Sequence, residues 1–65
     1  MNKISVYMQK HIVIDAMRTY GGGFVKAMAE MLAHADLNNT YLIYTTWPDI
    51  WNKYLNFEKY FDENK

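Results

Sequence analysis

Three consecutive glycines, Gly21-Gly22-Gly23, interrupt the first half of the chain. Glycine adopts the left-handed backbone conformation that ends many helices, and a run of glycines lets the next element turn back closely. The run therefore predicts a tight turn between two helices, the first of which ends near Tyr20.

The residues before this turn have helical spacing. Apolar side chains recur at steps of three and four, the pattern of an amphipathic helix. The predicted buried face contains Ile4, Tyr7, Met8, His11, Ile12, Ile14, Met17 and Tyr20, and the polar face Gln9, Lys10, Asp15, Arg18 and Thr19. Residues 4–8 alternate in polarity and residues 11–15 are rich in β-branched side chains, so a short N-terminal strand is the alternative.

The stretch after the glycines predicts a second helix over residues 24–35, because Ala, Met, Leu, Glu and Lys dominate it. Its predicted inner face contains Phe24, Ala27, Met28, Met31 and Ala35, and its outer face Lys26, Glu30 and His34. Asp36 is a good N-cap residue for a third helix over about 37–45. Residues 41–46 also have the composition of a strand, so that alternative stays open.

The segment Thr46-Trp47-Pro48-Asp49 predicts the start of a fourth helix. Proline is tolerated in a first turn, and Thr46 with Asp49 imitates a capping box. Helical spacing continues to Phe61, and residues 62–65 are expected to fray. The whole chain, 1–65, is thus expected to form one small domain: an all-α compact bundle of three or four short helices, with an α+β fold as the alternative.

The size and composition of the chain restrict how it can be stabilised. It has 65 residues, of which 51% are hydrophobic, and no cysteine, so a disulfide framework and a thiolate metal site are excluded. Domains of this size often add a disulfide, a metal or a partner subunit to a core that is small. We therefore expect a protein partner or self-association as a homo-oligomer.

Charge and hydropathy argue against two classes of partner. Seven basic and seven acidic residues cancel, so no positive field favours nucleic acid. The longest apolar run, residues 41–44, has four residues, far below the roughly 20 of a membrane span, and no signal peptide is evident. The expected location is the cytoplasm, with no membrane partner.

One spaced pattern suggests an origin. Its residues are Tyr20-Gly21-Gly22-Gly23-Phe24-Val25, Ala27-Met28-Ala29-Glu30, Ala35-Asp36, Asn39, Trp47-Pro48-Asp49-Ile50-Trp51 and Tyr54. With these residues, roughly positions 20 to 54, the chain resembles small uncharacterised proteins of bacteriophages, prophages and other mobile elements. The resemblance implies helices and an accessory role, and it carries over no activity, cofactor or catalytic residue. The first twenty residues are outside it.

No combination of residues predicts an enzyme. His11 and Asp15 share one side of a helix, but a metal or acid/base site would need more groups, such as His34 and Asp36, in a particular register. The glycine run is followed by Phe24 rather than by the Lys-Ser/Thr of a phosphate-binding loop. We therefore expect no catalytic residue, no metal and no cofactor.

Aromatic residues supply the candidate binding surface. Eight of the eleven aromatic residues lie at or after Tyr41. They either fill the core or form the centre of a protein interface, where Trp and Tyr are enriched. The predicted partner-binding residues are Tyr44, Trp47, Trp51, Tyr54 and Phe61. The sequence thus favours a non-enzymatic interaction or regulatory protein, with a small DNA-binding regulator using Lys10, Arg18 and Lys26 as the alternative.

Overall fold

The computed structural model describes residues 2–57. Four α-helices make up this part of the chain: α1 (Lys3–Tyr20), α2 (Gly23–Ala33), α3 (Leu37–Thr46) and α4 (Pro48–Leu55). The all-α prediction is confirmed, and the alternative strands at residues 4–8 and 41–46 are wrong, since both segments are helical. The predicted continuation of the last helix to Phe61 and the fraying at 62–65 lie outside the described residues.

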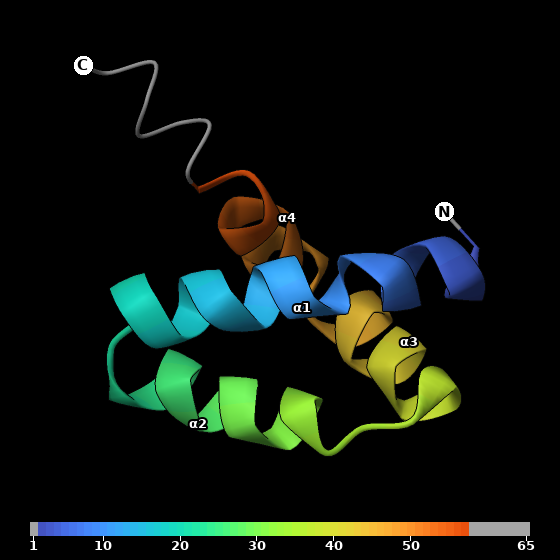
Figure 1. Cartoon of the computed structure of the whole chain (residues 1–65), viewed down its shortest axis with the longest axis horizontal. Helices are drawn as coiled ribbons and strands as arrows, with labels where there is room; N and C mark the ends of the chain where they lie inside the picture. Colours follow the sequence, from blue (N-terminus) through green and yellow to red (C-terminus); the bar gives the residue numbers. More distant parts are fainter. Residues whose placement is uncertain (1, 58–65) are drawn as a thin grey trace.

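Helix α1 is the centre of the bundle. It contacts each of the other three helices, whereas those three contact one another less. Figure 1 shows α2 running back alongside α1, with α3 and α4 crossing behind it. The core therefore lies around α1 and is built from Val6, Val13, Ile14, Ala16, Met17, Met28, Ala29, Leu32, Ile43, Trp51 and Tyr54.

The predicted buried face of α1 is wrong along the first three turns of the helix. Ile4, Met8 and Ile12 are 65%, 69% and 45% exposed, while Val6 and Val13 are fully buried. The first half of α1 carries apolar residues on two sides, so spacing alone does not determine which side is covered. The other helices pack on the side of Val6 and Val13.

Two residues predicted to lie on the polar face of α1 turn inward instead. The Nζ of Lys10 donates a hydrogen bond to the carbonyl oxygen of Ala35 at 2.6 Å, and Gln9 Oε1 accepts one from Trp51 Nε1 at 3.1 Å. Both contacts are partly buried. They satisfy polar groups that would otherwise be costly inside the bundle, and they tie α1 to residues far along the chain.

The turn between α1 and α2 forms as predicted, but without a left-handed residue. Gly21 ends α1 in an extended conformation (φ −79°, ψ 154°), and no glycine has a positive φ. Glycine is needed at position 21 for space: a Cβ there would lie 2.5 Å from Val25 Cγ1 and 2.6 Å from the Met17 carbonyl oxygen. A Cβ at Gly22 or Gly23 would meet nothing within 4 Å.

Asp36 caps α3 as predicted, since its Oδ1 accepts a hydrogen bond from the backbone N–H of Asn39 at 2.8 Å. We expect Asp36→Ala to lower the free energy of unfolding by about 1 kcal/mol, because the first turn of α3 loses this acceptor. Urea unfolding followed by circular dichroism measures the change. Asp36→Asn keeps a side-chain acceptor and is the matched control, so an equal loss in both variants would contradict the capping role.

Pro48 separates α3 from α4. A residue before proline is pushed away from the helical conformation, and Trp47 accordingly has φ −128° and ψ 60°. The predicted capping box is wrong, because α4 has no side-chain cap and the Thr46 hydroxyl donates to the Leu42 carbonyl oxygen inside α3. Trp47 is therefore held at a bend between two helices.

Candidate functional site

The structure separates the predicted partner-binding residues into two groups. Trp51 and Tyr54 are buried in the core, at 1% and 6% exposure, so their assignment to a binding surface is corrected. They lie on the side of α4 that packs against α1, and that contact removes their rings from solvent. Tyr44 and Trp47 are half-buried, and Phe61 lies outside the described residues.

Ring contacts explain why these aromatic residues are internal. Tyr44 meets the Trp51 ring edge-on, with centroids 5.6 Å apart. The Phe57 ring stacks on both Tyr54 and Tyr20, at 5.6 Å and 4.2 Å. Such pairs are a favourable way to fill space between short helices. Trp47, by contrast, lines an open apolar hollow.

That hollow lies between α2 and the bend at Trp47. Its volume is about 240 Å³, and it is lined by Phe24, Ala27, Met28, Met31 and Trp47. A second hollow of about 240 Å³ adjoins it at Met31 and is lined also by His34, Ala35, Asn39, Leu42 and Ile43. We call six of the apolar residues that line these two hollows the α2 groove: Phe24, Ala27, Met28, Met31, Leu42 and Trp47.

The α2 groove is open to solvent at three of its residues, whereas its Met28 is buried, and it carries no acidic, lysine or arginine side chain. Phe24 is 67% exposed, Leu42 60% and Met31 47%. Figure 1 shows α2 along one edge of the bundle, with α1 on one side of it. A groove with apolar walls that remain in solvent resembles a protein-binding surface.

The apolar residues of α2 outnumber those that its packing on the core uses. Their spacing predicts that Phe24, Ala27 and Met31 face the core, but α2 buries Met28, Ala29 and Leu32. α2 therefore has a second apolar stripe beside the one that packs on α1. When a helix has apolar residues outside the stripe that it buries, those residues indicate a further contact surface.

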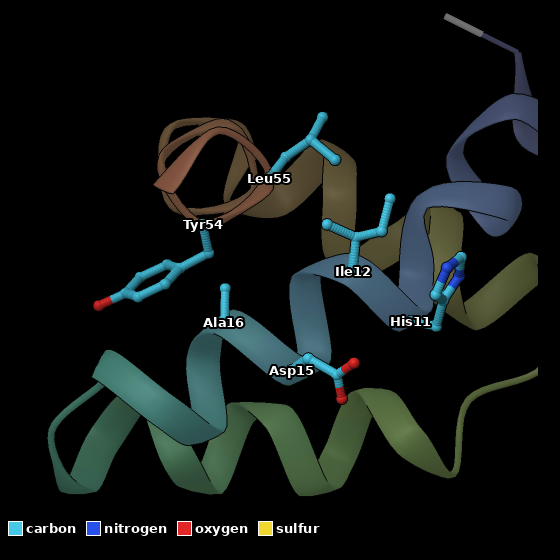
Figure 2. Close-up of a pocket in the computed structure, with 6 residues that line it drawn as sticks. All are labelled: His11, Ile12, Asp15, Ala16, Tyr54 and Leu55. Atoms are coloured by element: carbon cyan, nitrogen blue, oxygen red, sulfur yellow. The ribbon is translucent and has the colours of Figure 1, made fainter. Parts of the chain in front are cut away.

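A third hollow, of about 160 Å³, lies between α1 and α4 and includes His11 and Asp15. Figure 2 shows the Asp15 carboxylate directed toward α2, whereas the His11 ring lies on another side and the Tyr54 hydroxyl points away from both. Among residues 2–57, no group of three His, Asp or Glu side chains is arranged to hold a metal ion. These side chains do not converge on a common point, so the hollow carries no chemistry that we assign.

Two of the cations in the DNA-binding alternative are engaged within the chain. Arg18 forms an ion pair with Glu30 at 2.9 Å, and Lys10 bonds the Ala35 carbonyl oxygen. The Arg18–Glu30 pair is solvent-exposed and adds little stability, but it neutralises the positive charge beside α2. A basic face made of Lys10, Arg18 and Lys26 would have to give up these contacts.

Comparisons with known proteins add no relative. No protein-family model, curated protein or solved structure matches the chain. The resemblance to proteins of mobile elements therefore stays a prediction. In the part of the chain that the structure describes, no helix has the length and hydropathy needed to cross a bilayer.

Proposed function

We propose that this chain is a non-enzymatic protein-binding module whose α2 groove receives an apolar helix face of another protein molecule. One observation carries the proposal: Phe24, Met31 and Leu42 are all about half or more exposed, and they border hollows between α2, α3 and the bend at Trp47. Helices dock into such grooves through apolar anchors spaced three and four residues apart.

The packing of α2 supports this assignment. Met28, Ala29 and Leu32 already secure the helix to the core, so Phe24 and Met31 are not required to hold α2 in place. Exposing an aromatic ring and a long apolar side chain side by side lowers solubility unless a partner covers them. The proposed role therefore assigns the exposed stripe to binding and the buried stripe to folding.

A photo-crosslinking experiment tests the proposal. Leu42 is replaced by p-benzoylphenylalanine in the native host, with the same replacement at exposed Asn52 as the control. We expect a protein adduct at position 42 that is absent at position 52. The protein in the adduct is then purified, and its binding to the chain is measured. Phe24→Ser should weaken that reconstituted binding about 30-fold, which corresponds to about 2 kcal/mol for an interface anchor.

Stability provides the second readout. Because Phe24 is largely exposed, we expect the Phe24→Ser variant to unfold within a few degrees of the wild-type midpoint. An adduct at position 52 as strong as that at position 42, or reconstituted binding unchanged by Phe24→Ser, would contradict the assignment of the α2 groove.

A further inference from the structure

We infer that Lys10 of α1, which lies outside the α2 groove, is a positioning residue that holds the two walls of this groove in place. The inference rests on the proposed function and deepens it, since it concerns how the same site keeps its shape. The Nζ of Lys10 donates a hydrogen bond to the carbonyl oxygen of Ala35 at 2.6 Å. Ala35 lies in the connection between α2 and α3, residues 34–36, and it lines the hollow that these two helices border.

The walls of the α2 groove come from helices that contact each other little. Met31 belongs to α2 and Leu42 to α3, and the hollow between them is open. Both helices pack mainly on α1 rather than on each other. Their relative position therefore depends on α1 and on the short connection at 34–36, and a bond from α1 to this connection acts on both walls.

The C-terminal end of α2 is suited to a positive charge. Carbonyl oxygens at the C-terminus of a helix lack partners within the helix and carry partial negative charge. Helix α2 has no lysine or arginine in its last turn, so Lys10 supplies the cation from a neighbouring helix. Hydrogen bonds from charged donors are shorter and stronger than neutral ones, and 2.6 Å is short for a nitrogen donor.

The hydrogen bond is supported at both of its ends. The Lys10 side chain is half-buried, and its Nζ lies 5.0 Å from the centroid of the Tyr7 ring, a favourable cation–π distance. The Ala35 carbonyl oxygen also accepts the hydroxyl of Thr40, a fully buried residue of α3, at 3.5 Å. One oxygen thus joins α1, the 34–36 connection and α3, so removal of the Lys10 donor should let α3 shift relative to α2.

Nuclear magnetic resonance of the full chain with labelled methionine methyl groups tests the inference. Lys10→Leu removes the charged donor and keeps an apolar side chain, whereas Lys10→Arg keeps a positive charge and N–H donors. We expect the methyl resonance of Met31, a groove residue, to shift in Lys10→Leu and to return most of the way to its wild-type position in Lys10→Arg. The methyl resonance of Met17, which is fully buried in the core, should shift less in both variants.

A matched variant separates positioning from a general loss of stability. Asn2→Ala removes the N-cap of α1, a hydrogen bond of 2.8 Å from the Ser5 N–H to Asn2 Oδ1 that involves no groove residue. This variant should be destabilised and should keep the Met31 resonance in place. If Lys10→Leu does not fold, Lys10→Gln, which has a neutral donor on a shorter side chain, should shift Met31 in its place.

Binding to the partner is the second readout. The protein purified from the adduct at position 42 is titrated against the wild type and both Lys10 variants. Residues that touch no ligand can still change affinity when they hold the binding surface in place. We expect Lys10→Leu to weaken binding about tenfold and Lys10→Arg to recover most of that loss.

The outcomes separate this inference from the proposed function. An unmoved Met31 resonance in Lys10→Leu, an equal shift in Asn2→Ala, no recovery in Lys10→Arg, or unchanged partner binding would each overturn the role of Lys10 and leave the α2 groove as a binding site. A wild type without an adduct at position 42 would contradict the proposed function. The Met31 resonance would then decide alone whether Lys10 holds α2 and α3 in place.

Discussion

Trp51→Ala is expected to leave the chain largely unfolded at room temperature. The indole is 1% exposed, meets Tyr44 edge-on, and donates its N–H to Gln9 Oε1 at 3.1 Å. Removing a buried tryptophan costs about 3 to 5 kcal/mol, which is comparable to the entire stability of a domain this small. Far-UV circular dichroism of the variant should therefore show a loss of most helical signal.

Two other substitutions keep this test specific. Trp47→Ala removes the same type of side chain four residues away, where it is half-buried, and it should cost less than half as much. Trp51→Phe keeps a ring in the core and loses the hydrogen bond to Gln9, so we expect a loss of about 1 to 2 kcal/mol. A folded Trp51→Ala variant with a midpoint near that of Trp47→Ala would contradict the burial of the indole.

Gly21→Ala is expected to lower the free energy of unfolding by about 1 to 3 kcal/mol. The backbone at this position suits any residue, but the added methyl group would lie 2.5 Å from Val25 Cγ1 and 2.6 Å from the Met17 carbonyl oxygen. The carbonyl belongs to the last turn of α1 and accepts the Gly21 N–H, so it cannot move without weakening that bond. Urea unfolding at equilibrium measures the loss.

The neighbouring glycines provide the control for this prediction. Gly23→Ala adds the same methyl group in open space at the first position of α2, and it should be neutral or stabilise by up to about 1 kcal/mol. Val25→Ala in the Gly21→Ala background removes one of the two close contacts and should restore part of the loss. Equal effects at positions 21 and 23 would mean that the turn does not depend on this contact.

The ends of the helices could be predicted from sequence because they depend on a few adjacent residues. Asp36 caps α3 through the next three residues, and Pro48 ends α3 through the conformation of the one before it. The covered faces could not be predicted in the same way. Ile4 and Val6 are both apolar, and the choice between them depends on which side of α1 the later helices occupy.

In the candidate site, too, the sequence indicates the residue types but not which of them the packing covers. Trp47 and Trp51 are identical residues one helical turn apart, and both are suited to a core or to an interface. What separates them is the packing of α4 on α1, which covers Trp51 and leaves Trp47 at the bend. Sequence spacing also places the groove residue Phe24 on the wrong face, because α2 has enough apolar residues for two contacts.

The central position of α1 has a consequence for biosynthesis. Helix α1 is the first to leave the ribosome, but the side chains that cover it come from α2, α3 and finally α4, down to Trp51. Until that residue has been released, Val6, Val13 and Met17 have no complete set of neighbours. The native core can therefore form only after Trp51 has left the ribosome, and nascent α1 is a segment that chaperones would meet before α4 has emerged.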